Sequence, residues 1–348
     1  MPTPSAPRSL CLLRLSALGD AVHALALVRD LQTAWPGLPI TWVIGKGEAK
    51  LLEGLDGVEF VVFDKKSGWA GLRELRRQLA GREFDVLLNM QLALRAGLAS
   101  TGIRARRRIG FDRARSKEGH SLFINERIPA GGWHVQDAFR QFLQPLGITP
   151  GPIRWDLPVP AEAHEWAAQH LPGEQPTLLV SPCSSHALRN WRPERYAAVA
   201  DHAAGRGWRV AICGGRSELE RKTADAILAA MRAPALDLVG KDTLKQLLAL
   251  LGRATLVLTP DSGPAHMANA MGTAVLGLHA CTDAERSGPY SDRRWTVNRY
   301  AEAAERFMRR PASALPWGKR IEFTGVMDLV TVEDVIARFE AFRTERGL

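Results

Sequence analysis

Four segments carry residue types that could bind or activate a phosphorylated substrate, and each links a predicted strand to a predicted helix. The first is Arg14-Leu15-Ser16-Ala17-Leu18-Gly19-Asp20. Its small residues predict a turn into a helix whose first N–H groups could hold an anion. The helix dipole favours a charged carboxylate at Asp20, which could then accept a proton, although the same position also suits a simple N-cap.

The second segment, residues 259–266, reads TPDSGPAH and also ends at the start of a predicted helix. Ser262, the flexible Gly263 and the N–H groups that follow could cradle a phosphate, and His266 could add a hydrogen-bond donor one turn later. Taken alone, Asp261 and His266 are equally consistent with a helix cap and its core partner.

The third and fourth segments, CSSHALRNWRPE (residues 183–194) and GGRSELE (residues 214–220), suggest a clamp for a nucleoside diphosphate. Hydroxyls at Ser184 and Ser185 with the guanidinium of Arg189 match phosphate oxygens, and an acid in the fourth segment could bind ribose hydroxyls. No segment has the full G-x-G-x-x-G pattern or a P-loop Gly-Lys-Ser/Thr, which disfavours a dinucleotide oxidoreductase and an NTPase.

The elements around these segments predict an α/β fold. Short aliphatic runs alternate with longer helical patterns, as in βαβ units with parallel sheets covered on both faces. Strands are expected at residues 9–15, 40–44, 58–63 and 84–90, and again at 177–181, 208–213, 256–259 and 275–278. Between these sets, residues 147–160 (GITPGPIRWDLPVP) form a proline-rich connector, so two doubly wound domains are predicted.

Composition narrows the class of protein and of partner. The chain has 348 residues, of which 46% are hydrophobic and 24% charged, so it is long enough for two folded cores. The four cysteines are far apart, and Arg14 interrupts the apolar run near the N-terminus, which favours a reducing, cytosolic setting without a secretion signal. A formal net charge of +9 favours anionic partners.

Much of this excess charge is concentrated in residues 104–117, where seven basic residues accompany the single acid Asp112. Three interpretations remain open for this run: a solvated, solubilising face, a binding surface for an anionic acceptor, or a nucleic-acid interface. No RRM, KH or helix-turn-helix signature supports the last of these.

Taken together and in this order, the segments resemble glycosyltransferase family 9, the ADP-heptose:lipopolysaccharide heptosyltransferases. The resemblance runs from Leu10 to about Tyr290 and is most specific in LSALGDAVHALALV and TPDSGPAHMANAMGTAVLGLHACTD. RIGFDRARSKEGHSLFINERI is closer to the heptosyltransferase I type. The family implies a GT-B fold of two Rossmann-like domains facing a cleft: residues 1–155 for the acceptor, 156–325 for the nucleotide sugar, and a C-terminal helix, 326–348, that packs back across the domains.

By this resemblance Asp20 matches the catalytic base of an inverting transfer of heptose from ADP-L-glycero-D-manno-heptose to the Kdo region of lipopolysaccharide. Glu220, with Glu218 as an alternative, matches the ribose-binding acid. The positions that correspond to donor contacts are Ser184, Ser185, Arg189, Glu220, Asp242, Asp261, Ser262, Gly263 and His266. Two departures stand out: Arg192 splits the usual Trp-Pro pair, and His279-Ala280-Cys281-Thr282-Asp283 replaces the usual Gly-Pro-Thr-Asp.

The resemblance also implies a Kdo-lipid A acceptor, met at the cytoplasmic face of the inner membrane by a peripherally bound enzyme. The expected acceptor contacts are Lys65, Lys66, Arg115, Lys117, His134 and Arg140. No D-x-D motif is apparent among the donor segments, so neither a metal ion nor a cofactor is expected. A family 9 enzyme with another nucleotide sugar, a nucleotide-sugar epimerase and a basic nucleic-acid-binding protein remain the alternatives.

Overall fold

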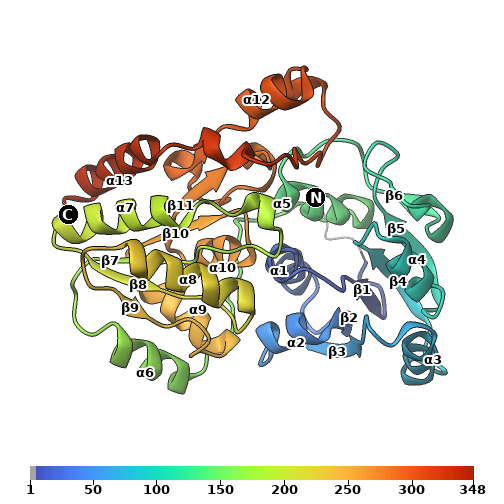
Figure 1. Ribbon diagram of the computed structural model, residues 1–348. Helices are drawn as coiled ribbons and strands as arrows, with labels where there is room; N and C mark the ends of the chain where they lie inside the picture. The colour runs from blue at the N-terminus through green and yellow to red at the C-terminus, as the bar shows by residue number, and fades with distance from the viewer. Residues whose placement is uncertain (1–4) are drawn as a thin grey trace. The chain divides into compact units, whose positions relative to one another are not determined.

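The computed structural model describes residues 5–348 and divides the chain into two compact units. The first ends at Pro158 and the second is Val159–Leu348, so the division lies within the proline-rich segment 147–160. Each unit contains a six-stranded parallel sheet with helices on its faces (Figure 1). This confirms the α/β prediction.

The first unit has the strand order β3-β2-β1-β4-β5-β6. Its elements are β1 (Leu10–Leu13), α1 (Leu18–Ala34), β2 (Ile40–Gly45), α2 (Lys46–Leu52), β3 (Val58–Phe63), α3 (Gly68–Gln78), β4 (Phe84–Asn89), α4 (Leu94–Ser100), β5 (Ala105–Gly110), η1 (His120–Phe123), β6 (Glu126–Arg127), α5 (Val135–Arg140) and η2 (Gln141–Leu146).

The second unit has the strand order β12-β11-β10-β7-β8-β9. Its main elements are α6 (Ala161–His170), β7 (Thr177–Val180), η3 (Ala187–Arg189), α7 (Pro193–Gly205), β8 (Arg209–Ile212), α8 (Glu218–Ala230), β9 (Leu236–Asp237), α9 (Leu244–Arg253), β10 (Leu256–Pro260), α10 (Gly263–Ala270), β11 (Ala274–His279), α11 (Ala284–Ser287), β12 (Val297–Asn298), α12 (Tyr300–Ala303) and α13 (Val332–Arg346).

The strand order of each sheet indicates where a ligand would bind in that unit. Each sheet reverses its winding direction at one point, between β1 and β4 in the first unit and between β10 and β7 in the second. Open α/β sheets bind ligands outside the carboxyl ends of their strands at such a switch point. The loop that ends at Asp20 follows β1, and the loops with Ser184 and Asp261 follow β7 and β10. All three loops therefore lie at the expected edge of their own sheet.

Two parts of the first unit differ from the sequence prediction. The helix expected over residues 134–146 ends at Arg140 and continues as the 3₁₀ helix η2, which contains Pro145. Proline has no N–H for an α-helical bond and clashes with the preceding turn, which explains the change. Helix α4 and strand β5 are absent from the sequence prediction. For β5 the reason is its three consecutive arginines, which are unusual in a strand inside a sheet.

Helix α13 closes the core of the second unit. Thr331 caps it by accepting a hydrogen bond from the Asp334 N–H, and the helix lies along α7 (Figure 1). The ring of Phe339 contacts Trp208, and Phe342 contacts Trp295, with ring centroids 4.9 and 5.2 Å apart. The expected packing of this helix against the first domain stays a prediction.

All four cysteines are free and buried. Burial raises the pKa of the Cys11 and Cys213 thiols far above the ordinary range, so both are unreactive in the folded protein. Within residues 5–348, no helix is both long enough and apolar enough to cross a bilayer.

Candidate active site

Asp20 lies at the start of α1, after the carboxyl end of β1. Ala17 is the N-cap of this helix, so Asp20 is its third residue and not the cap itself. The Asp20 carboxylate accepts a hydrogen bond from the Ala17 N–H (3.1 Å) and forms an ion pair with Arg14. Its side chain is 31% exposed, so the carboxylate is oriented and still open to a substrate.

Arg14 is fixed by the loop that follows β4. Its guanidinium is 12% exposed, donates to the carbonyl of Met90 and lies 5.1 Å above the ring of Phe139. Gln91, the next residue along, accepts a hydrogen bond from the Leu15 N–H (2.7 Å). These contacts join the two loops at the switch point of the first sheet.

His134 is brought close to the same helix, but it is buried. It caps α5 by accepting the Gln136 N–H at Nδ1 (3.0 Å). The Gln136 side chain makes two hydrogen bonds with His23: its Oε1 lies 2.8 Å from the ring Nδ1, and its Nε2 donates to the His23 carbonyl (3.0 Å). Because His23 lies one turn beyond Asp20, α5 is attached to the first turns of α1.

The six predicted acceptor residues do not form one surface. Lys66 and Lys117 are exposed, as an anion-binding role requires. The ammonium group of Lys65 lies 3.2 Å from the buried carboxylate of Glu48, so part of its charge is already balanced.

Arg115 and Arg140 both have carboxylate partners inside the first unit. The Arg115 guanidinium is buried, pairs with Asp112 and donates to the side chain of Gln141. Arg140 forms a two-pronged ion pair with Asp30, at 2.7 and 2.9 Å. The role of Arg115 and Arg140 as acceptor contacts stays a prediction.

Other arginines of the basic run 104–117 also have partners within the first unit. In β5, Arg106 pairs with Glu83 and Arg107 with Glu126, while Arg108 donates to three backbone carbonyls. Residues 105–110 of the run are thus an interior strand of the sheet whose arginines have partners. The nucleic-acid alternative loses the continuous cationic face on which it depended.

In the second unit, the loop after β7 places Ser184, Ser185 and Arg189 at the sheet edge. Ser184 is buried, its N–H donates to the side chain of Asn190 (2.7 Å), and its hydroxyl donates to the His186 carbonyl (3.0 Å). Ser185 is exposed. Ser184 therefore shapes the loop, and Ser185 presents its hydroxyl to solvent.

Arg189 reaches from this loop to the loop after β10. Its Nη1 lies 3.4 Å from the Asp261 carbonyl and 3.6 Å from the Asp261 carboxylate. Asp261 also accepts a hydrogen bond from Ser287 (3.3 Å) and lies 3.7 Å from His266. The structure thus brings together Arg189, Asp261 and His266, which come from widely separated parts of the sequence.

The electrostatics of Asp261 favour its charged form. Burial alone would raise the pKa of this carboxyl, but the hydrogen bond with His266 and the neighbouring His279 and Arg189 lower it well below its usual range. A fixed negative charge beside Arg189 orients the guanidinium for a bound phosphate.

The first turn of α10 completes this group. Ser262 is its N-cap residue, but the Ser262 hydroxyl forms a hydrogen bond with the Thr259 hydroxyl (2.9 Å) and none with the N–H groups of the helix. Pro264 has no N–H, while the N–H groups around Gly263 have no side-chain cap. A phosphate would satisfy these donors and the positive end of the helix dipole.

Glu220 is distinguished from Glu218 by its geometry. The Glu220 carboxylate turns back into the loop after β8, where it accepts the Gly215 N–H (2.7 Å) and the Ser217 hydroxyl (2.6 Å). Glu218 points outward and pairs with Lys222 on the helix surface. Of the two acids, Glu220 is therefore the one that lies in the loop after the carboxyl end of β8.

Asp242 lies near Glu220, in the turn before α9. Its Oδ2 atom is buried and has no hydrogen-bond partner among the residues that the structure describes. Burial, together with the charge of Glu220, raises the pKa of Asp242 to about 6. A buried oxygen without a partner is a position where a ligand donor could bind.

His279, the first residue of the departure from the family's Gly-Pro-Thr-Asp, lies near Asp261. It ends β11, is buried, and its Nδ1 lies 3.2 Å from the Thr282 hydroxyl. Burial lowers the pKa of His279, although Asp261 opposes this effect, so the ring is neutral near pH 7. The sequence does not show that His279 lies near Asp261, because the two residues come together only through the pairing of β10 with β11.

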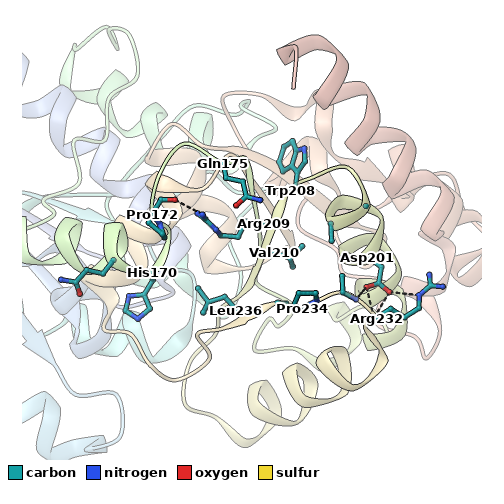
Figure 2. A pocket seen from close by; sticks show the side chains of 15 residues that line it. His170, Pro172, Gln175, Asp201, Trp208, Arg209, Val210, Arg232, Pro234 and Leu236 are labelled. Atoms are coloured by element: carbon teal, nitrogen blue, oxygen red, sulfur yellow. Dashed lines mark hydrogen bonds and ion pairs between the residues drawn. The ribbon is translucent and has the colours of Figure 1, made fainter.

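A hollow of about 1020 Å³ in the second unit lies away from these loops. Figure 2 shows its lining, which includes Pro172, Gln175, Arg209 and Leu236. Arg209 and Leu236 begin β8 and β9, so the hollow lies at the amino ends of these strands. The candidate site residues lie in the loops after the carboxyl ends of the strands, so the hollow is separate from them.

Across residues 5–348, no group of three or more His, Cys, Asp or Glu side chains is arranged to hold a metal ion. Metal-independent activity stays a prediction. The loops after β7 and β10 contribute positive groups through Arg189 and the N–H donors of α10.

The fold is that of a two-domain GT-B glycosyltransferase. A glycosyltransferase family 9 structure from Veillonella parvula matches with a TM-score of 0.80 at 21% identity, covering 97% of this chain and 98% of that one. The structure of E. coli heptosyltransferase WaaC with ADP matches with a TM-score of 0.71 at 18% identity, covering 96% of this chain and 99% of that one.

The chain belongs to glycosyltransferase family 9 (heptosyltransferase), whose model matches residues 72–317. It is 40% identical to the lipopolysaccharide core heptosyltransferase OpsX of Haemophilus influenzae over 336 residues, covering 96% of this chain and 97% of the relative. The protein is therefore a glycosyltransferase.

Proposed function

We propose that this enzyme transfers a heptose from ADP-L-glycero-D-manno-heptose to the Kdo region of a lipopolysaccharide precursor, with inversion at the anomeric carbon. The observation that carries the proposal is the pairing of Arg189 with Asp261 beside the uncapped start of α10, a site suited to a sugar diphosphate. The Haemophilus influenzae relative is named as a lipopolysaccharide core heptosyltransferase, and a solved structure with the same fold is described with ADP-2-deoxy-2-fluoro heptose.

In this reaction the second unit binds the donor. Arg189 and the N–H groups of α10 stabilise the diphosphate, and Glu220 accepts hydrogen bonds from the ribose. The bond between the anomeric carbon and the phosphate oxygen breaks, and its electron pair goes to ADP. Since the negative charge on the leaving group grows, donors fixed in advance lower the barrier.

Asp20 acts on the acceptor. It takes the proton from an acceptor hydroxyl as that oxygen forms the new bond to the anomeric carbon, on the face opposite to ADP. The transition state is oxocarbenium-like, as in glycoside cleavage. Arg14 holds the carboxylate in position, and Lys66 and Lys117 provide charge for the anionic acceptor.

A panel of nucleotide sugars tests donor and acceptor together. The purified enzyme is incubated with Kdo2-lipid A and each of ADP-heptose, ADP-glucose, UDP-GlcNAc and GDP-mannose, with and without EDTA, and products are analysed by mass spectrometry. We expect a heptose adduct from ADP-heptose alone, unaffected by EDTA. Transfer of another sugar would favour the second candidate, a family 9 enzyme with a different donor, for which the His279 to Cys281 departure provides a structural reason.

We further propose that the enzyme binds peripherally to the cytoplasmic face of the inner membrane. Support comes from apolar side chains on three neighbouring elements of the first unit: Trp69 is 75% exposed, Leu94 49% and Leu122 84%. Arg95 of α4 donates to the carbonyl of Lys65 just before α3, and α4 also contacts η1. Trp69, Leu94 and Leu122 therefore belong to one region.

The charges around these side chains fit an anionic bilayer. Lys66, Arg95 and Lys117 are exposed there, while the nearby acids Asp64 and Glu118 accept hydrogen bonds from backbone N–H groups. Inserted aromatic and aliphatic side chains combined with cations are a recurring mode of peripheral binding.

Vesicle sedimentation without any acceptor measures this binding. The wild type should bind phosphatidylglycerol-containing vesicles more tightly than phosphatidylcholine vesicles, and the double variant Trp69→Ser/Leu122→Ser should lose about tenfold in affinity through lost apolar burial. Leu219→Ser on α8, which removes a 44% exposed leucine of the second unit, is the matched control. Equal binding by all three proteins would rule out this surface.

A further inference from the structure

The chain returns to the donor loops of the second unit after β12, in residues 316–323. Ile321 is fully buried there, and its N–H donates to the Cys281 carbonyl (2.9 Å). Two residues earlier in the chain, the Lys319 carbonyl accepts a hydrogen bond from the Tyr300 hydroxyl (2.8 Å). Arg320 lies between these two anchors, so its backbone position is fixed.

The Arg320 side chain points to the loop after β7. Its Nη1 lies 3.2 Å from Nε2 of His186 and 3.8 Å from the carboxylate of Glu322. His186 is the residue next to Ser185, between the two serines and Arg189. The Arg320 side chain is 47% exposed, and its guanidinium has five N–H donors, more than these contacts use.

Arg320 and Arg189 reach the same part of the site from different segments. Both lie close enough to Cys281 to act on its thiol: burial raises the pKa of Cys281, and Arg189 and Arg320 each oppose this effect. Arg189 faces the fixed negative charge of Asp261 at 3.6 Å. Because Arg189 lies beside Asp261 and Arg320 beside Glu322, the two guanidinium groups together balance the charge of a diphosphate better than either does alone.

We propose that Arg320 is a second guanidinium contact of the donor diphosphate. The inference rests on the proposed function, in which the second unit binds a nucleoside diphosphate sugar. When the donor binds, Arg320 exchanges its contact with His186 for phosphate oxygens, and it stabilises the charge that ADP gains as the sugar leaves. Arg320 lies outside the residues 72–317 that match the family model.

Binding of ADP and of adenosine, measured by calorimetry or by displacement, tests the contact. Arg320→Gln should weaken ADP binding by about tenfold or more, the usual loss for a hydrogen bond to a charged group, and should leave adenosine binding unchanged. Arg320→Lys keeps the charge but not the paired donors, so an intermediate affinity for ADP is expected.

Arg310→Gln, at an exposed arginine of the preceding segment, is the matched control and should bind ADP like the wild type. Unchanged ADP affinity in Arg320→Gln would overturn the proposal, and so would an equal loss for ADP and adenosine, which would indicate a distorted loop. Failure of the wild type to bind ADP would instead refute the proposed donor, and the contact with it.

Discussion

Asp20→Asn should reduce kcat for sugar transfer by about 10²- to 10⁴-fold, the usual contribution of a general base, while the affinity for ADP stays the same. Asparagine has nearly the same shape and can still accept the Ala17 N–H, so the start of α1 is preserved. It cannot take a proton from the acceptor hydroxyl. Steady-state kinetics with ADP-heptose, together with calorimetry of ADP binding, measure both effects.

The exposed acid Asp56 provides a control for Asp20 in the same unit. Asp56→Asn should keep full activity, which shows that the loss is not caused by a change in net charge. Near-normal transfer by Asp20→Asn would contradict the assignment of Asp20 as the base. A parallel loss of ADP affinity would point to a structural effect instead.

Asp30→Ala should lower the free energy of unfolding by about 3–5 kcal/mol, because it leaves the charge of Arg140 unpaired in a nearly buried place. The two side chains are only 9% and 12% exposed, and the guanidinium contacts both carboxylate oxygens. Thermal unfolding, followed by circular dichroism, would show a transition at markedly lower temperature.

The exposed pair of Arg8 and Asp85 gives the comparison for this effect. Arg8 is 79% exposed, and Asp85→Ala should lower the free energy of unfolding far less than Asp30→Ala, since solvent screens such pairs. The double variant Asp30→Leu/Arg140→Met should recover much of the loss, because it removes both charges. Equal stability of Asp30→Ala and Asp85→Ala would show that the Arg140 pair does not stabilise the first unit.

Local sequence was sufficient to predict the strand, turn and helix around Asp20. Small residues between an aliphatic run and a helical pattern leave few other structures, and the carboxyl end of a parallel strand is where a ligand binds. The same reasoning located the loops of Ser184 and Asp261. These are features that a chain segment determines largely by itself.

Ion pairs between distant segments could not be predicted in this way. Arg140 finds its partner 110 positions away in Asp30, and nothing near Arg140 in the sequence indicates this pairing. Arg115 has its partner Asp112 close by, but its burial depends on the surrounding fold. Sequence alone therefore does not show that the charges of Arg115 and Arg140 are balanced inside the unit.

Strand β5 shows a related difficulty. Three consecutive arginines suggest an exposed loop, because strands in the middle of a sheet are normally apolar. Here Glu126 and backbone carbonyls satisfy the guanidinium groups, and the strand forms between β4 and β6. Only the three-dimensional arrangement shows that these donors have partners.

Cys11 in β1 is the one buried thiol of the first unit, and Cys213, just after β8, is one of three buried thiols in the second. A reagent can reach either sulfur only when the surrounding sheet opens. Alkylation of Cys11 and of Cys213, followed by peptide mapping, can therefore show which unit opens first when the temperature is raised or a substrate is added.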